Sequence, residues 1–352
     1  MSTRSWFSRA LLPWYRENRR PLPWRNTRDP YRIWLSEVIL QQTRVDQGLA
    51  YYTRFVERYP TVRHLAQAPD GEVMKLWQGL GYYSRARNLL AAARAVNALP
   101  GARFPDSVEG LRALKGVGDY TAAAIASIAF DRPAAVVDGN VYRVLARVFG
   151  IGTPIDSTVG RKEFAALAGE LVDPAHPGDH NQAVMELGAT VCTPRNPACD
   201  RCPLARRCIA RKEERVDLLP VKAGRTKVRE RHFHYLVLGN GRSLVLHQRT
   251  DRDIWRDLYQ PPLVETPGPV TKRTVAALAS ELLGRKVVLG EPNGPVKHVL
   301  SHQVIHASFW PVRGPLPRKL PTGWRVVDRA GLEEHAVPRL IERYLAEHFS
   351  LK

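Results

Sequence analysis

The four cysteines of this 352-residue chain all lie within seventeen residues, as Cys192, Cys199, Cys202 and Cys208. Four thiolates on one short loop can surround a single metal centre, either a tetrahedral zinc ion or a [4Fe-4S] cluster. Structural zinc usually uses two C-x2-C pairs, whereas here only the middle two cysteines have that spacing. The pattern C-x6-C-x2-C-x5-C therefore favours a cluster held by one loop over zinc and over a pair of disulfides.

The chain is strongly basic, with 53 Lys and Arg against 34 Asp and Glu and a net charge of +19. Solubility does not need so large an excess, which is typical of proteins that bind polyanions. Nucleic acid is the first candidate partner and an anionic membrane surface the second. Four arginines interleave with the cysteines, where they either contact phosphate or belong to a solvated loop: Arg195, Arg201, Arg206 and Arg207.

No run of residues approaches the length of a membrane span, and no signal peptide is recognisable at the N-terminus. We therefore expect a cytoplasmic protein, nucleoid-associated if bacterial. The first twenty residues could form a basic amphipathic helix that lies on a membrane, but the positive charge continues through the whole chain, which favours no membrane contact.

The length allows two or three domains, and the sequence changes character near residue 212. Residues 1–212 have apolar residues at helical spacing interrupted by turn signals, which predicts a many-helix domain. Residues 213–230 are polar and aperiodic, as in an interdomain linker. Residues 231–352 predict an α+β domain that starts with a hairpin around Asn240-Gly241 and contains a helix at 271–283. Further strands are expected at 286–289, 304–310 and 324–327.

The segment LRALKGVGDYTAAAIASIAF predicts two helices joined by a tight turn at Gly116-Val117-Gly118. Glycines allow a ligand to approach the backbone closely, and the free N–H groups at the start of the second helix attract anions. Such a turn can hold a DNA phosphate without reading sequence, although an ordinary structural turn has the same pattern.

Two carboxylates stand out in the helical domain. Asp138 lies between an apolar run and a helix, where an N-cap carboxylate accepts free N–H groups and stays ionised. Glu37 lies on a helix that is apolar nearly all round, so burial should raise its pKa and let it act as a general acid. An acid and a fixed anion together suit the cleavage of a glycosidic bond. The alternatives are an ordinary helix cap and a Glu paired with arginine.

These motifs together resemble a known family. The strings LKGVGDY and VVDGN, followed by the cysteine loop, resemble the helix-hairpin-helix DNA glycosylases of the endonuclease III type. Within them, WLSEVILQQT, GLGYYSRARNL, VDGNVYRVLAR and NQAVMELGATVC resemble the MutY family of adenine DNA glycosylases. The resemblance implies an all-α helix-hairpin-helix domain with a [4Fe-4S] loop, followed by an α+β Nudix-like domain. It also implies duplex DNA carrying adenine opposite 8-oxoguanine or guanine as the substrate, and a monomer.

The resemblance implies catalytic roles for four residues. Glu37 matches the acid that protonates adenine N7, and Asp138 matches the carboxylate that stabilises the sugar cation. Tyr120 and Asn140 match residues that orient these groups. Relatives that also cleave the strand carry a nucleophilic lysine in place of Tyr120, so we expect a monofunctional glycosylase.

Further residues are assigned to DNA and base recognition by the same resemblance. The adenine pocket is expected to contain Trp24, Arg25 and Gln182. The residues expected to contact DNA or 8-oxoguanine are Gln42, Thr43, Leu80, Tyr82, Gly116, Gly118 and Ser301.

Three other functions remain open at this point. A thymine or uracil mismatch glycosylase could also have Tyr120, and a catalytically silent iron-sulfur protein could bind DNA. A triphosphate hydrolase would need the Glu-rich metal box of Nudix enzymes, but the corresponding helix has only Glu281.

Overall fold

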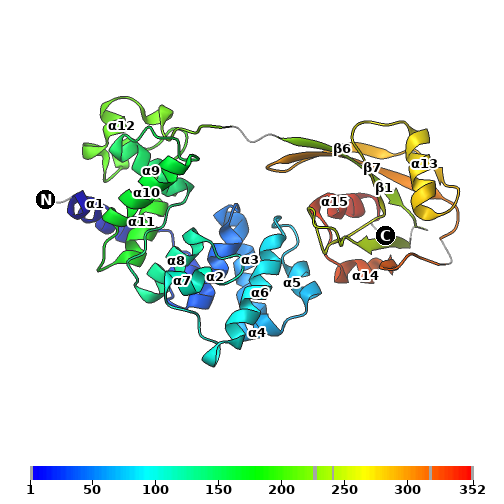
Figure 1. Cartoon of the computed structure of the whole chain (residues 1–352), viewed down its shortest axis with the longest axis horizontal. Coiled ribbons are helices and arrows are strands. Elements are labelled where there is room, and N and C mark those ends of the chain that lie inside the picture. The colour runs from blue at the N-terminus through cyan, green and yellow to red at the C-terminus, as the bar shows by residue number, and fades with distance from the viewer. Residues whose placement is uncertain (1–2, 225–227, 240–241, 317–318, 350–352) are drawn as a thin grey trace. The chain divides into compact units, whose positions relative to one another are not determined.

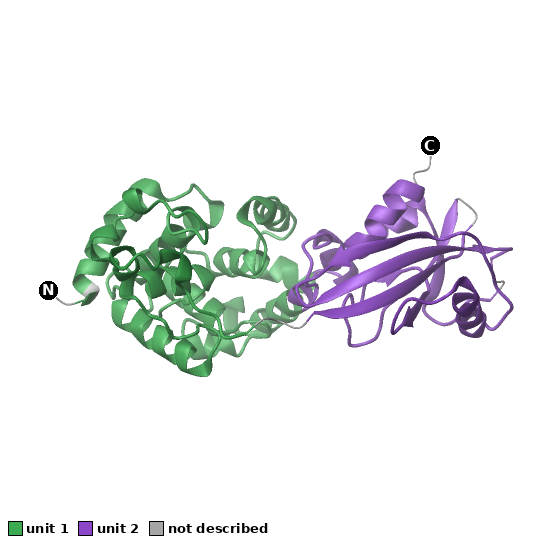
Figure 2. Cartoon of the chain, turned by 90° about the horizontal axis from the view of Figure 1, so that it is seen from above, with its two compact units in different colours: residues 1–67, 88–224 green, residues 68–87, 225–352 purple. Residues whose placement is uncertain are grey.

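The computed structural model describes residues 3–224, 228–239, 242–316 and 319–349. The chain packs as two compact units, shown in green and purple in Figure 2. The first unit comprises residues 1–67 and 88–224, and the second comprises residues 68–87 and 225–352. The second unit therefore takes one segment from the middle of the predicted helical domain.

The first unit is helical (Figure 1). Its α-helices are α1 (Thr3–Asn18), α2 (Pro30–Leu40), α3 (Val45–Arg58), α4 (Val62–Gln67), most of α6 (Ser84–Ala98), α7 (Val108–Arg112), α8 (Asp119–Phe130), α9 (Gly139–Phe149), α10 (Thr158–Leu171), α11 (Pro177–Thr190) and α12 (Ile209–Lys212). Its short 3-10 helices are η1 (Pro23–Arg25), η2 (Pro100–Ala102), η3 (Cys199–Arg201), η4 (Ala205–Arg207) and η5 (Val216–Leu218).

The apolar face of α1 is part of the core of this unit. Phe7, Leu11 and Tyr15 are buried in one hydrophobic core with residues such as Val144 and Leu187, and α1 contacts α10 and α11. Burial of these side chains supplies the main driving force for docking α1. The face that would have to lie on a membrane is thus occupied, and the amphipathic pattern reflects core packing.

The predicted pair of helices joined by a tight turn is formed by α7 and α8. Gly116 has φ +81°, and a Cβ there would lie 2.6 Å from the Cβ of Asn88, so this position requires glycine. Gly118 is the N-cap of α8 and has an ordinary negative φ, with no atom within 4 Å of where a Cβ would be. The two glycines therefore serve different purposes, one for folding and one for leaving space.

The predicted linker is only partly a linker. Leu219 is buried in the core of the first unit, and Arg147 on α9 donates to the carbonyl oxygens of Val216 and Leu219. The carboxylate of Asp156 accepts hydrogen bonds from the N–H groups of Ala223 and Gly224. Residues 213–224 thus pack on the helices in spite of their polar sequence, because buried arginine and backbone groups satisfy one another.

The second unit contains two sheets flanked by helices (Figure 1). One sheet has the order β4-β1-β7-β5 with β6 also paired to β7, and the other has the order β3-β2-β8. The strands are β1 (Arg229–Val237), β2 (Ser243–Gln248), β3 (Tyr259–Gln260), β4 (Leu263–Thr266), β5 (Val288–Leu289), β6 (Asn293–Val299), β7 (Gln303–Arg313) and β8 (Trp324–Asp328). The helices are α5 (Asp70–Leu76), α13 (Lys272–Leu283), α14 (Arg329–Glu334) and α15 (Arg339–His348).

Helices cover both faces of the larger sheet. On one face Val275 of α13 packs with Leu236 and Trp310, and on the other Phe309 stacks on Tyr344 of α15 at 3.8 Å. The central pair β1 and β7 is parallel, while β4, β5 and β6 pair antiparallel. The predicted helix at 271–283 and the predicted later strands are confirmed.

The predicted β-hairpin at the start of this unit is wrong. β1 pairs with β4 and β7, whereas β2 pairs with β3 and β8 in the other sheet. Among the described residues the two strands meet only where they are closest in sequence, at an antiparallel bridge between Gly239 and Leu244 with a hydrogen bond from the N–H of Val245 to the carbonyl oxygen of Leu238. Asn240 and Gly241 lie outside the described residues. Each strand finds its partners at long range because both have apolar residues on both faces, and local turn chemistry does not decide their pairing.

Residues 68–87 join the second unit through specific hydrogen bonds. Lys75 donates to the carbonyl oxygens of Leu332 and His335, and the side chain of Gln78 accepts from the N–H of Val337. These backbone acceptors and donors have no sequence signature, so the sequence alone predicts this segment as part of the helical domain. Among the described residues, no helix combines the length and apolarity that crossing a membrane requires.

Candidate active site

A cavity of about 610 Å³ in the first unit brings together all the residues predicted for catalysis and for the adenine pocket. It lies between α2, η1, α8, the start of α9 and α11. The predicted residues that line it are Trp24, Arg25, Glu37, Gln42, Thr43, Tyr120, Asp138, Asn140 and Gln182. The volume is that of a site for a small ligand, and its walls are mostly apolar with a few convergent polar groups.

Glu37 is a buried carboxyl group in this cavity. Only 9% of the residue is exposed, and its Oε2 accepts a 2.7 Å hydrogen bond from the hydroxyl of Tyr120. Burial raises the pKa of Glu37 to about 7, with a further rise from Asp138, while Tyr120 and Arg25 act in the opposite direction. A carboxyl that titrates near neutral pH can hold and deliver a proton, as a general acid must.

Asp138 is the N-cap of α9, as predicted. Its two carboxylate oxygens accept hydrogen bonds from the N–H of Val141 at 2.7 Å and from the side-chain amide of Asn140 at 2.8 Å. Burial nevertheless raises the pKa of Asp138 above its usual value, and these hydrogen bonds limit the rise. The cap geometry is thus confirmed, but burial outweighs the cap in setting the direction of the pKa shift.

Tyr120 stands at the start of α8 and joins two walls of the cavity. Besides Glu37, its hydroxyl contacts the sulfur of Met185 on α11 at 3.5 Å. Burial, followed by the nearby carboxylates, raises the pKa of Tyr120 well above 10, so the phenol stays neutral. No lysine lines the cavity in the part of the chain that the structure describes, so the site presents no primary amine to a sugar.

The sequence reasoning missed an ion pair in the wall of the cavity. Glu186 on α11 is fully buried and accepts hydrogen bonds from Arg20 and Arg25 at 2.6–2.8 Å. Although burial alone would raise it, these two arginines lower the pKa of Glu186 to about 2. Glu186 follows Gln182 by four residues, so the helical period already placed both side chains on one face.

A second missed residue is Arg143, which lies behind Asp138. Its guanidinium donates to Oδ1 of Asn140 at 2.8 Å and to the carbonyl oxygens of Gly188 and Cys192 at 2.7 and 2.6 Å. Arg143 is buried, and burial lowers its pKa. The side chain of Asn140 is therefore fixed in the orientation that directs its amide toward Asp138.

The four cysteines surround a small internal space of about 20 Å³ at the end of α9. All four are free thiols and partly buried, which excludes disulfides between them in this structure. Arg147 contacts the sulfur of Cys192 at 3.4 Å, and burial raises the pKa of Cys202 to about 11. Buried thiolates need positive charge nearby, which arginine and iron supply.

The four cysteines also fit a cluster by their arrangement, because all four line one small internal space and Arg147 lies beside Cys192. Four thiolates around one centre are the ligand set of a [4Fe-4S] cluster. The residues present therefore fit a [4Fe-4S] cluster, held by Cys192, Cys199, Cys202 and Cys208.

The residues predicted to contact DNA divide between the two units. Gln42 and Thr43 line the cavity of the first unit, whereas Leu80, Tyr82 and Ser301 belong to the second. Gln42 and Tyr82 both have positive φ, +55° and +46°, a backbone conformation that residues other than glycine seldom adopt. Leu80 is buried.

Ser301 lies in the short turn between β6 and β7. The N–H of Leu300 donates to the carbonyl oxygen of Gln303 at 2.8 Å and closes the turn. The hydroxyl of Ser301 is hydrogen-bonded to the hydroxyl of Tyr82, which comes from the segment 68–87 of the same unit. Two residues assigned separately to recognition thus meet in this structure.

Three family models match this chain. Residues 35–167 match the HhH-GPD superfamily of base excision DNA repair proteins, residues 192–208 match the iron-sulfur binding domain of endonuclease III, and residues 234–347 match the NUDIX domain. The expected helical glycosylase domain, [4Fe-4S] loop and Nudix-like domain are thereby confirmed.

Among solved structures, a thermostable thymine-DNA glycosylase is 33% identical with a TM-score of 0.55, covering 60% of this chain and 97% of its own. A non-covalent endonuclease III–DNA complex has a TM-score of 0.51 at 23% identity, covering 61% of this chain and 99% of its own, and supports the fold alone.

The curated relatives carry one name. The adenine DNA glycosylases of Mus musculus and Homo sapiens are 48% and 50% identical over 64% and 58% of this chain, which spans only 45% and 39% of their length. The adenine DNA glycosylase of Buchnera aphidicola subsp. Schizaphis graminum is 35% identical over 74% of this chain and 75% of its own length. The chain therefore belongs to the adenine DNA glycosylase family.

Proposed function

We propose that this protein is a monofunctional DNA glycosylase of base excision repair, which hydrolyses the N-glycosidic bond of adenine opposite 8-oxoguanine or guanine. The observation that carries the proposal is the pairing of a protonatable Glu37 with Asp138 in one cavity of about 610 Å³. The relatives named above supply adenine as the base. A flipped nucleotide must leave the stack to reach such a cavity.

The chemistry divides between the two carboxyl groups. Glu37 donates its proton to N7 of the flipped adenine, which makes the base a better leaving group. Asp138, fixed by Val141 and Asn140, stabilises the oxocarbenium-like sugar until water attacks. This division needs Glu37 protonated and Asp138 ionised at the same pH, and the second hydrogen bond to Asp138 favours its anion.

Base recognition falls to the remaining cavity residues and to the second unit. Trp24, Arg25 and Gln182 form the adenine pocket, with the Arg25 guanidinium held by Glu186. Gln42 and Tyr82 enter the duplex beside the mismatch. The residues assigned to the neighbourhood of 8-oxoguanine are Thr43, Leu80 and Ser301.

Monofunctional chemistry follows from Tyr120. Strand cleavage by a glycosylase requires an amine that forms a Schiff base with the sugar, and a neutral phenol cannot do so. Tyr120 instead orients the Glu37 carboxyl group through its hydrogen bond. The protein is accordingly expected to leave an abasic site with an intact strand.

Binding to duplex DNA rests on charge and on the α7–α8 turn. The net charge of +19 provides a sequence-independent attraction whose strength falls with salt. Gly116 allows the tight turn that presents the N-terminus of α8, and Gly118 leaves space for a phosphate to approach it. The [4Fe-4S] cluster, when bound, holds the basic cysteine loop in shape. We expect a monomer that acts on DNA in the cytoplasm, at the nucleoid in a bacterium.

A mismatch panel under single-turnover conditions tests the proposal. Duplexes carrying A opposite 8-oxoguanine, A opposite G, and T or U opposite G are incubated with the protein, and base release is measured with and without alkaline strand cleavage. Adenine release that depends on alkali for strand scission is the expected result. Glu37→Gln and Asp138→Asn should abolish release while DNA binding persists.

Other outcomes would overturn the proposal in distinct ways. Release of thymine but not adenine would identify the activity named for the thymine-DNA glycosylase neighbour. Strand cleavage without alkali would contradict the role of Tyr120. Hydrolysis of oxidised nucleoside triphosphates with Mg²⁺ and without base release would assign the chemistry to the Nudix-like domain instead.

A further inference from the structure

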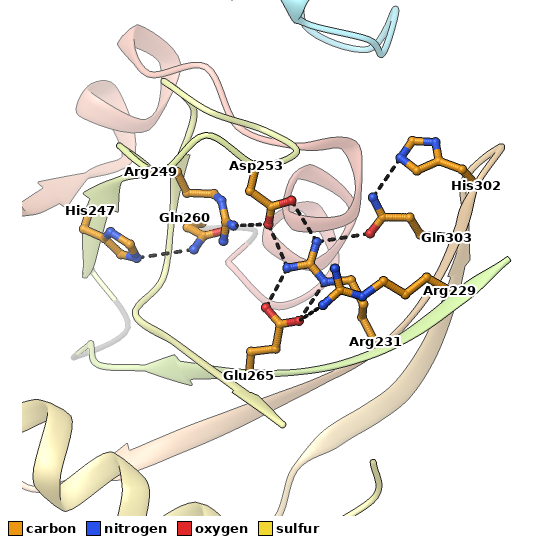
Figure 3. A network of polar contacts seen from close by, with 9 residues as sticks. All are labelled: Arg229, Arg231, His247, Arg249, Asp253, Gln260, Glu265, His302 and Gln303. Atoms are coloured by element: carbon orange, nitrogen blue, oxygen red, sulfur yellow. Dashed lines mark hydrogen bonds and ion pairs between the residues drawn. The ribbon is translucent and has the colours of Figure 1, made fainter. Parts of the chain in front are cut away.

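A buried arginine stands at the centre of a polar network in the second unit (Figure 3). The side chain of Arg231 on β1 is only 5% exposed. Its guanidinium donates to both carboxylate oxygens of Glu265 on β4, at 2.7 and 2.6 Å, and to both of Asp253, at 3.0 and 2.7 Å. Arg231 thus makes two bidentate ion pairs at once, which fixes its plane.

The same guanidinium also reaches the strand that follows the Ser301 turn. Nη1 of Arg231 donates to Oε1 of Gln303 at 3.1 Å, and the amide nitrogen of Gln303 lies 2.8 Å from Nε2 of His302. Gln303 is 6% exposed and begins β7. Figure 3 shows this chain of contacts running from Glu265 and Asp253 through Arg231 and Gln303 to His302.

Backbone contacts bind the turn at its base. The N–H of Arg229 donates to the carbonyl oxygen of His302 at 3.1 Å, and the N–H of Leu300 donates to that of Gln303. Ser301 therefore lies at the tip of the turn. The two residues that follow it, His302 and Gln303, are held by both side-chain and backbone contacts. These contacts fix the backbone from which the Ser301 hydroxyl is presented.

Stability alone does not account for this arrangement. Burying an arginine between two carboxylates costs desolvation, and apolar residues of similar volume are commonly as stabilising or more so. A neighbouring buried arginine, Arg249, balances the charge by donating to Asp253 at 2.8 Å. A rigid, planar guanidinium also fixes the position of any further group that it binds. In this network that group is Gln303.

We propose that Arg231 and Gln303 are positioning residues that set the Leu300–His302 turn, so that the Ser301 hydroxyl is presented to the base opposite the excised adenine. This inference rests on the proposed function. It assigns the polar network the task of discriminating the opposite base, whereas the chemistry of base removal belongs to the first unit. The network should therefore affect which mismatch is preferred and leave adenine release opposite guanine unchanged.

Gln303→Leu is the sharpest test, because it removes the link to the turn and leaves the ion pairs of Arg231 intact. The change removes two hydrogen bonds of Gln303, with Arg231 and with His302, and each lost hydrogen bond corresponds to about a twofold to tenfold change in an equilibrium or rate. We expect the preference for A·8-oxoguanine over A·G, as the ratio of single-turnover rates, to fall by about that factor. Gln303→Glu keeps the acceptor for Arg231 but loses the amide donor that contacts His302, so it should restore the preference only in part.

Arg231→Met and Arg249→Met form a matched pair, since each removes a buried arginine bonded to Asp253. Only the Arg231 variant should lose the preference, while both lower the melting temperature. Ser301→Ala tests whether Gln303 acts through the Ser301 hydroxyl. Combined with Gln303→Leu, it should cause no further loss of the mismatch preference, because both changes remove the same contact with the base. Equal loss of preference in the two arginine variants, or additive effects of Gln303→Leu and Ser301→Ala, would contradict the proposal.

Amide hydrogen exchange keeps the test independent of the enzymatic activity. Protection of the Leu300 N–H should fall in Gln303→Leu and remain in Arg249→Met. If the wild-type protein fails to release adenine, the proposed function fails, and exchange still decides whether the network orders the turn. If adenine is released and neither preference nor protection responds to Gln303→Leu, the positioning role alone is wrong.

Discussion

The hydroxyl of Tyr120 on α8 donates a 2.7 Å hydrogen bond to Oε2 of Glu37 on α2, and this bond joins the helix after the α7–α8 turn to the helix that carries the proposed acid. Hydrogen bonding to a carboxylate favours its charged form, whereas burial favours the neutral form. In Glu37 burial prevails and raises the pKa to about 7. The phenol therefore limits how strongly the acid holds its proton.

Tyr120→Phe should shift the pH profile of adenine excision upward. The proposed reaction needs protonated Glu37, so its rate should fall as pH rises through the pKa of that group. Removing the phenol removes a contact that lowers this pKa, so the decline should begin at higher pH. Single-turnover rates of excision at several pH values around neutrality measure this shift. Tyr142→Phe, a change on α9 outside the cavity lining, should leave the profile where it is.

Glu37→Gln should abolish excision and stabilise the fold in alkaline solution. The pKa of Glu37 rises from 4.5 to about 7 on folding, so the wild-type protein loses stability as pH increases between those values. At about pH 8 the amide should gain about 3 kcal/mol in unfolding free energy, and at about pH 4 almost nothing, because both side chains are then neutral. Denaturant titrations at the two pH values measure the gain. An equal effect at both would contradict the burial argument.

Glu186→Gln should have the opposite dependence on pH. Its pKa of about 2 lies below the usual 4.5, so the ion pair contributes fully above pH 4.5 and is lost as pH falls toward 2. We expect a loss of about 3 kcal/mol in unfolding free energy at neutral pH, shrinking in acid. Glu213→Gln breaks an exposed pair with Arg215 and serves as the control, with a change below about 1 kcal/mol.

Gly116→Ala and Gly118→Ala should separate folding from DNA binding. A methyl at Gly116 collides with Asn88 and forces a positive φ on alanine, which should cost about 1–3 kcal/mol of stability. A methyl at Gly118 meets no protein atom, so stability should hold while affinity for duplex DNA falls, because the methyl stands where a phosphate would approach. Melting curves and binding isotherms at one salt concentration measure both. Unchanged affinity in Gly118→Ala would argue against phosphate contact at this turn.

Local patterns in the sequence were enough to predict the positions of Asp138 and Glu37. Asp138 was identifiable as an N-cap from the apolar run before it and the helix after it, and Glu37 as a buried acid from the apolar residues around it. Both positions are confirmed because cap geometry and helical periodicity act over a few residues. The spacing of the four cysteines is likewise a local pattern.

Local patterns did not predict which residues or strands pair over a long distance in the sequence. The partners of Glu186 lie more than 160 residues away at Arg20 and Arg25, and arginines are too frequent in this chain for one to be singled out. The Asn-Gly turn predicted a hairpin, yet β1 found a parallel partner in β7 about seventy residues later. In each case the partner is chosen by packing in the folded state, which a local pattern does not encode.

The membership of residues 68–87 in the second unit bears on how this protein can be divided. Helix α6 starts at Ser84 in one unit and ends at Ala98 in the other, so no single cut in the chain separates them. Removing everything after residue 224 would strip Lys75 and Gln78 of their backbone partners and Tyr82 of Ser301. A truncated catalytic fragment is therefore a protein with an unsupported segment, and its loss of mismatch preference would not measure the contribution of the Nudix-like domain alone. Point changes in the intact chain are the experiment that this architecture permits.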